Sequence, residues 1–179
     1  MPVDIIPAGD ALLAQGHLTW PNDHRLNLEG VSALFSAVLP FAEPHLRVEM
    51  ATIPLVVLLK MVAWLDRPAD RARALYDLAF LLTDYLDEHD DADFDRILSA
   101  VQQGHVDHHA ANAFVLGQDV ARCEGAGRVA QRFVDSLSTS HRWMLSEMQA
   151  KGPAMLSRDE AFDAVWRSFT QGLGIERSR

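Results

Sequence analysis

Residues 53–86 read IPLVVLLKMVAWLDRPADRARALYDLAFLLTDYL, and this stretch decides the fold. Residues 55–66 contain no glycine or proline, so one helix is predicted there. Arg67-Pro68 ends that helix, because proline cannot continue it. After an N-cap at Asp70, apolar residues recur at helical spacing over residues 74–86. The stretch therefore predicts a hairpin of two antiparallel helices.

Lys60 is a lone charge in the middle of the first helix. Its neighbours over residues 53–65 are apolar on every face, so this helix is predicted to be buried nearly all round. Burying an unpaired ammonium is costly, and Lys60 therefore needs a carboxylate, a ligand or a path for its side chain to solvent. The carboxylates within reach are those of Asp66, Asp70 and Asp77.

Asp77 occupies a position in the second helix that suits a partner of Lys60. In an antiparallel hairpin with a short turn, Asp77 returns to the level of the middle of the first helix, where Lys60 lies. A lysine and a carboxylate that face one cleft suit a triphosphate with its magnesium ion, and they equally suit each other. Spacing alone leaves both interpretations open.

The rest of the chain divides into a strand-rich start and a helical remainder. Before the hairpin, short strands are predicted at 3–6, 17–20, 26–28 and 46–50, with a helix at 31–41. After it, helical patterns cover 94–101, 110–123, 129–137, 141–148 and 158–169. We therefore expect an α+β fold, with a sheet region over 1–51 and a helical region over 52–179.

Composition excludes several classes of protein. The chain has 179 residues, 49% hydrophobic and 23% charged, which is typical of a soluble globular protein. A net charge of −9 argues against binding long nucleic acid, although a few cations could hold a small anion. One cysteine, Cys123, excludes an internal disulfide and favours a cytoplasmic setting. No apolar run reaches the ~20 residues of a membrane span, and the start has no basic segment of a secretory signal.

Two other motifs hint at metal chemistry. His105 and His109 are four residues apart, with Asp107 and His108 between them, as in a helical metal site; a solvated helix start is the preferred interpretation. His89-Asp90 is shared with metal-dependent phosphohydrolases of the His-Asp type, but that class needs further His and Asp ligands on other helices. We keep the phosphohydrolase as a minor alternative.

The chain resembles the nucleotidyltransferases of the AbiEii and AbiGii toxin-like family. The resemblance is strongest in the hairpin, where KMVAWLDRP (60–68) is followed by YDLAFLL (76–82). Weaker matches are VDIIP (3–7), which resembles the strand of the family's third active-site carboxylate, NLEG (27–30), and the helical tail at 110–121. The resemblance covers most of the chain and implies a small nucleotidyltransferase-like sheet followed by a helical half.

The resemblance also implies an activity and its residues. A hydroxyl would attack the α-phosphate of a nucleoside triphosphate, and pyrophosphate would leave. Asp4, Lys60 and Asp77 are the implied catalytic residues. Lys60 and Arg67 would bind the triphosphate, and Asp4 would bind Mg²⁺. The implied partners are a nucleoside triphosphate and an antitoxin protein, while the acceptor and the preferred base are not specified.

Two departures from the family pattern bear on activity. Ala74 stands where the family has a second aspartate, three residues before Asp77. The family also has a Gly-Ser or Gly-Gly motif and two carboxylates on a strand, and no such motif precedes Asp4. The sheet is therefore expected to be incomplete. The resemblance implies a nucleotidyltransferase-like protein that transfers a nucleoside monophosphate from a nucleoside triphosphate to an unspecified acceptor, and the missing motif leaves open whether the chain as given is catalytically complete. The alternative is a non-catalytic remnant or binding module.

Overall fold

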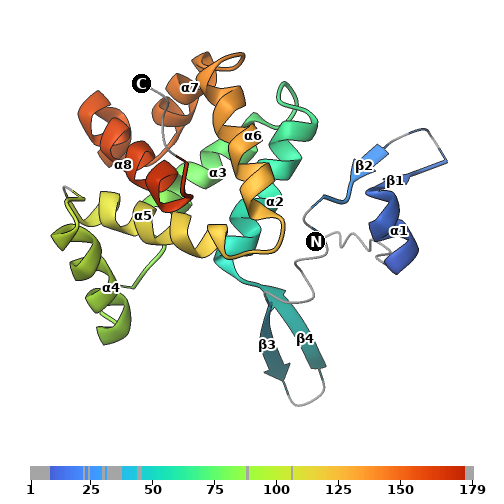
Figure 1. The fold of residues 1–179 in the computed structure, drawn as a ribbon, viewed down its shortest axis with the longest axis horizontal. Coiled ribbons are helices and arrows are strands. Elements are labelled where there is room, and N and C mark those ends of the chain that lie inside the picture. Colours follow the sequence, from blue (N-terminus) through green and yellow to red (C-terminus); the bar gives the residue numbers. More distant parts are fainter. Residues whose placement is uncertain are drawn as a thin grey trace.

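The computed structural model describes residues 9–21, 23, 25–29, 31, 38–43, 46–87, 89–105 and 107–175. Figure 1 shows the helices from α2 onward gathered in one body, with the β3–β4 hairpin projecting from it. The elements are α1 (Asp10–Gln15), β1 (His17–Thr19), β2 (Arg25–Asn27), β3 (Val38–Glu43), β4 (Leu46–Ala51), α2 (Ile53–Asp66), α3 (Ala72–Thr83), α4 (Asp91–Gln102), α5 (His108–Ala121), α6 (Ala126–Ser138), α7 (Trp143–Lys151), the 3₁₀ helix η2 (Ala154–Ser157) and α8 (Asp159–Gly172).

The strands form two separate antiparallel pairs. β1 pairs with β2, with Leu18 opposite Leu26, and β3 pairs with β4, with Val38 opposite Ala51. The predicted strands near residues 17–20, 26–28 and 46–50 are confirmed, and so is the α+β class. The strand predicted at 3–6 lies outside the described residues.

The helix predicted over residues 31–41 is wrong from Val38 onward, because strand β3 begins there. Pro40 lies in this strand, opposite Glu49 of β4. Proline would break the interior of a helix, but it is tolerated in a two-stranded pair, where each strand has one unpaired edge. The strand that pairs with β3 begins at Leu46, outside residues 31–41, whose apolar pattern suggested a helix.

The predicted helical hairpin is confirmed as α2 and α3, with one correction at the turn. Asp70 is not the N-cap of the second helix. Its N–H donates to the carbonyl oxygen of Arg67 at 3.1 Å within the turn, and Arg71 is the residue that precedes α3. The second helix therefore begins one residue later than its sequence suggested, and it ends at Thr83.

α2 contributes much of the core, although it is not buried on every face as predicted. Leu55, Leu58 and Trp64 are fully buried, whereas Ile53 is 41% exposed. α2 packs against α3, α5 and α6, and the Trp64 ring meets Phe133 of α6 edge to face with ring centroids 5.3 Å apart. This packing leaves one stripe of α2 facing outward.

The remaining helices follow the predicted pattern closely. Gly152 and Pro153 separate α7 from η2. The acidic stretch 84–95 includes the start of α4 at Asp91. The Asp90 carboxylate caps α4 by accepting from the N–H groups of Ala92 and Asp93. Carboxylates near a helix N-terminus are stabilised by the helix dipole.

The closest approach between helices is that of α5 and α8. A Cβ atom at Gly117 would collide with the carbonyl oxygen of Phe169, and one at Gly172 would collide with that of Phe114. The two glycines thus allow two backbones to touch. Among the described helices, none is long and apolar enough to cross a membrane.

Candidate functional site

Lys60 and Asp77 form an ion pair between α2 and α3. The Lys60 Nζ donates to the Asp77 Oδ2 at 2.6 Å, and the two side chains are 27% and 39% exposed. Of the three carboxylates that the sequence offered as partners, Asp77 is the one that the hairpin brings to Lys60. The predicted juxtaposition is confirmed, and Lys60 reaches solvent on this side of the helix.

The ion pair lies in a cleft that is lined by residues of α2, of α3 and of the turn between them. Its volume is about 550 Å³. On α2 the lining positions recur every three or four residues, which is one face of a helix, and the same spacing recurs on α3. The lining residues are Val56, Leu59, Lys60, Ala63, Asp70, Arg71, Arg73, Ala74 and Asp77.

The charge of this cleft is opposite to that of the chain. Three cations, Lys60, Arg71 and Arg73, line it together with two carboxylates, Asp70 and Asp77. The whole chain carries −9. A local excess of positive charge in a concave, partly apolar site attracts a small anion. Both arginines are exposed, so their guanidinium groups are accessible to such a ligand.

Sequence reasoning missed Arg71 and Arg73 and emphasised Arg67 instead. Arg73 lies four residues before Asp77, so helical spacing alone could have placed the two on one face. Arg67 is half-buried in the turn, with its Nε 3.4 Å from the Asp66 carboxylate, and it is not among the residues that line the cleft. Asp4 lies outside the described residues.

The histidine motif does not form a metal site. His105 precedes α5, which begins at His108, so the proposed helical face with His109 does not exist. Its Nδ1 is 2.7 Å from the Ser168 hydroxyl, and burial lowers the pKa of His105. The Asp107 carboxylate caps α5, as the alternative interpretation expected. Within the part of the chain that the structure describes, no group of three or more His, Cys, Asp or Glu could hold a metal ion.

His89-Asp90 likewise has a structural explanation. Asp90 is the N-cap of α4, and His89 is exposed beside it. Its backbone N–H donates to the Asp87 carboxylate at 2.9 Å. Nothing in this arrangement brings further ligands to the dipeptide among the described residues.

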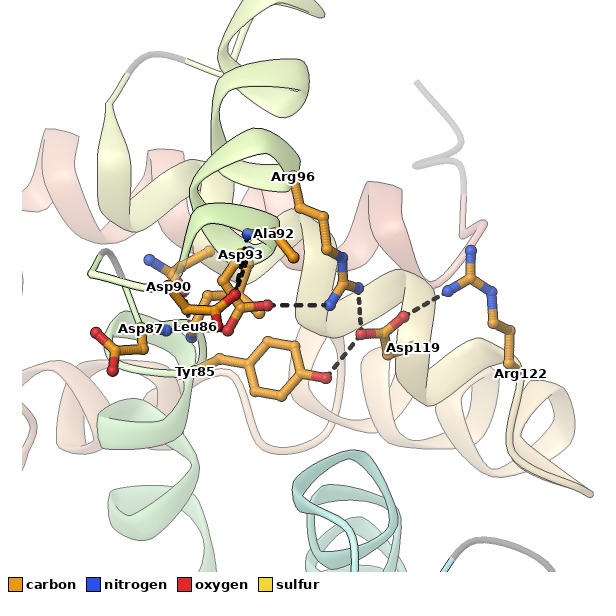
Figure 2. Close-up of polar contacts among 10 residues, drawn as sticks. Tyr85, Leu86, Asp87, Asp90, Ala92, Asp93, Arg96, Asp119 and Arg122 are labelled. Carbon is orange, nitrogen blue, oxygen red and sulfur yellow. Dashed lines mark hydrogen bonds and ion pairs between the residues drawn. The ribbon is translucent and has the colours of Figure 1, made fainter.

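Asp119 of α5 is the centre of a second polar cluster, which Figure 2 shows. Its carboxylate accepts from the Tyr85 hydroxyl at 2.7 Å and from the guanidinium groups of Arg96 and Arg122. Burial and the neighbouring Asp119 raise the pKa of Tyr85 well above its usual range. The side chain of Asp119 is only 13% exposed. Tyr85 and Arg96 reach Asp119 from outside α5, so these contacts hold α4 and the end of the hairpin against α5.

Another cavity, of about 830 Å³, lies between α6, α7 and α8 and shares no lining residue with the cleft of Lys60. Asp135, Asp159 and Asp163 line it, opposed by Arg142. This excess of carboxylates disfavours an anionic ligand. The cleft of the hairpin is therefore the better site for phosphates.

Comparison with known proteins gives one match. A family model described as "Nucleotidyl transferase AbiEii toxin, Type IV TA system" matches residues 21–173. The matched region includes the whole hairpin and all of the residues that line its cleft. No curated protein and no solved structure matches the chain.

Proposed function

The chain belongs to the AbiEii nucleotidyl transferase toxin family, and we propose that its α2–α3 hairpin binds the phosphates of a nucleoside triphosphate through Lys60. The family supports a nucleotidyltransferase-like function with an unspecified acceptor. In the proposed reaction, an acceptor hydroxyl attacks the α-phosphate, and pyrophosphate leaves. The observation that carries the proposal is the Lys60–Asp77 ion pair at the wall of a cation-rich cleft.

Asp77 is proposed to act by positioning Lys60. The carboxylate accepts one hydrogen bond from the ammonium in the free protein. An ammonium has three donors, so Lys60 can keep this contact and still donate to a phosphate oxygen. A cation held in place in this way loses less side-chain entropy on binding than a free lysine does. Asp77 is thus a positioning residue, and Lys60 is the residue that touches the substrate.

The arginines supply the remaining positive charge. Arg71 and Arg73 are exposed on the cleft, and a guanidinium group can hold two phosphate oxygens at once. We assign Arg73 to the outer phosphates and Arg71 to the inner part of the phosphate chain, and we propose that Arg67 in the preceding turn binds the same triphosphate. Together with Lys60 they would stabilise the charge that develops on the departing pyrophosphate.

The family also points to a divalent metal ion, and we propose that it is Mg²⁺, bound by the phosphates and by Asp4. Mg²⁺ is usually held by one or two carboxylates in addition to substrate phosphates. In the described cleft Asp77 is already paired with Lys60, and no three-residue set for a metal ion exists among the described residues. These residues do not fit the ion by themselves, so the binding steps above use only the side chains of the cleft.

Calorimetric titration with ATP tests the proposal. Lys60→Ala is expected to weaken binding about 10-fold or more, because a charge-assisted contact to phosphate is lost. Lys151→Ala is the matched control, since Lys151 is the other lysine of the chain and is exposed at the end of α7. Equal affinities of the wild type and Lys60→Ala would contradict the proposal.

A second function, nucleotide binding without transfer, is favoured by Ala74. This residue lines the cleft where the family has an aspartate, so the hairpin offers one carboxylate fewer for transfer chemistry. Release of pyrophosphate from ATP in the presence of Mg²⁺ and a panel of hydroxyl acceptors, abolished by Lys60→Ala, supports transfer. Tight binding of ATP with no such release supports the binding module.

The biological setting is also proposed from the family. The family description is that of a toxin in a toxin–antitoxin system, so an antitoxin protein is a proposed partner. A cytoplasmic location is proposed because the chain has a single cysteine, Cys123, as is common in reducing compartments. Purification of the protein with its genomic neighbour co-expressed would test the partner directly.

A further inference from the structure

A second cavity adjoins the cleft of Lys60 and differs from it in character. Its volume is about 260 Å³, and it lies between α2 and the segment that includes β2 and the residues after it. Its walls are mainly aliphatic side chains, namely Leu26, Leu28, Val31, Leu59, Val62 and Ala63. Small-ligand pockets start at ~300 Å³, so this cavity suits one part of a ligand rather than a whole nucleotide.

The two cavities adjoin each other along α2. Leu59, Ala63 and Arg71 line both of them. Leu59 and Ala63 lie one turn apart on α2, and Arg71 stands just before α3. A single molecule can therefore occupy the cationic cleft with an anionic part and the aliphatic cavity with an apolar part.

Asp66 and Arg71 also line the aliphatic cavity, and its other two polar residues, Asn27 and Glu29, already have partners. The Asn27 Oδ1 accepts from the backbone N–H of Glu29 at 2.8 Å. The Glu29 carboxylate binds the Arg132 guanidinium of α6 at 2.8 Å. This ion pair ties the segment after β2 to the helical body across 103 residues of sequence. The cavity wall is therefore mainly apolar, and the side chains of Asn27 and Glu29 already make their polar contacts within the protein.

We propose that this aliphatic cavity receives the base of the nucleoside triphosphate whose phosphates lie in the cleft. The inference rests on the proposed function. A base is flat, aromatic and largely apolar on its faces, so burying it between Leu26 and Leu59 removes apolar surface from water. Arg71, shared by both cavities, then lies at the junction of the base and the phosphates, where the ribose and the α-phosphate would lie.

Comparison of ATP with inorganic tripolyphosphate tests this inference separately from the proposed function. Both ligands offer three linked phosphates, but only ATP has a base. We expect calorimetry to give ATP at least about 10-fold higher affinity than tripolyphosphate, because only ATP buries apolar surface. Tripolyphosphate has no less negative charge than ATP, so charge alone would favour the opposite order.

Leu26→Trp should fill the cavity from β2. It is expected to reduce the affinity for ATP to that for tripolyphosphate and to leave the affinity for tripolyphosphate unchanged. Thr19→Trp is the control, because it adds the same ring at an exposed position of β1 outside both cavities. If Leu26→Trp does not fold, Leu26→Ala replaces it, and a selective loss of ATP affinity of a few fold is expected from the lost apolar contact.

The outcomes separate the two proposals. Binding of tripolyphosphate that depends on Lys60, with no preference for ATP, would overturn the base site and leave the phosphate site standing. If Leu26→Ala lowered the affinities for ATP and for tripolyphosphate equally, the base site would also be overturned. Absence of Lys60-dependent binding of either ligand would overturn the proposed function, and the base site with it.

Discussion

Ala74 lies on the cleft side of α3, one turn before Asp77, where the family pattern has a second aspartate. With alanine there, Lys60 has a single carboxylate partner in the hairpin, and the three cations of the cleft outnumber its two carboxylates. At the proposed nucleotide site, the phosphates would therefore contact side chains of the protein with no second carboxylate for a metal ion to offset. We infer that the residue at position 74 sets how far this proposed binding depends on metal.

Ala74→Asp is expected to make ATP binding depend on a divalent ion. Without Mg²⁺, a carboxylate beside the phosphates should weaken binding about 5- to 10-fold, since like charges a few ångströms apart near a surface repel by about 1 kcal/mol or more. With Mg²⁺ the two carboxylates could share the ion, and affinity should recover. Titrations with Mg²⁺ and with EDTA measure this difference.

Ala92→Asp is the control for that experiment, because it adds the same charge at an exposed position of α4, away from the cleft. If Mg²⁺ changed the affinity for ATP equally in Ala74→Asp and Ala92→Asp, position 74 would have no specific effect on the metal dependence of binding.

At the scale of single residues, the Lys60–Asp77 pair could be predicted from the sequence because both residues belong to one short hairpin. Helical periodicity fixes the face of each residue, and a short turn fixes the level at which they meet. The Asp119 cluster could not be predicted in the same way. Two of its donors, Tyr85 and Arg96, come from other parts of the chain that only tertiary packing brings to Asp119, whereas Arg122 lies three residues after Asp119.

At the scale of elements, the contact between α5 and α8 depends on two glycines. Sequence reasoning recognises glycine inside a helix mainly as a cost, yet Gly117 and Gly172 allow the two backbones to approach each other. The helices themselves were predictable from local spacing. Strand β3 was not, because its partner β4 lies across a turn and the local pattern over residues 31–41 resembled a helix.

Gly117→Ala is expected to destabilise the protein by about 3 kcal/mol, because the new methyl group must displace the backbone of α8. Gly127→Ala is the matched control in α6, where a Cβ atom has open space around it. This second change should stabilise the protein by about 0.5–1 kcal/mol through helix propensity. Urea unfolding of both variants measures the free energies, and a cost below about 0.5 kcal/mol at Gly117 would contradict the packing described.

At the scale of the whole molecule, the main core belongs to the helical region. Every buried member of the main apolar cluster lies between Leu55 and Ile175. The segment after β2 is attached to this body through the Glu29–Arg132 ion pair and the walls of the aliphatic cavity. We therefore propose that the chain is organised as a sheet region over residues 1–51 and a helical region over residues 52–179.

A fragment of residues 52–179 is expected to unfold cooperatively in urea, because it contains the whole main cluster. It also retains every residue of the cationic cleft but lacks Leu26, Leu28 and Val31. Its affinity for tripolyphosphate should therefore equal that of the full chain, while its preference for ATP is lost. A gradual, non-cooperative transition would show that the first 51 residues are needed for the fold.

The most direct test of a nucleotide site at Lys60 is chemical labelling of lysine amines with and without saturating ATP, followed by peptide mass spectrometry. The chain has two lysines, so Lys151 on α7 is an internal control. We predict that ATP slows the labelling of Lys60 about 5-fold or more, because binding occupies its ammonium, and leaves Lys151 unchanged. Labelling of Lys60 at the same rate with and without ATP would contradict the account.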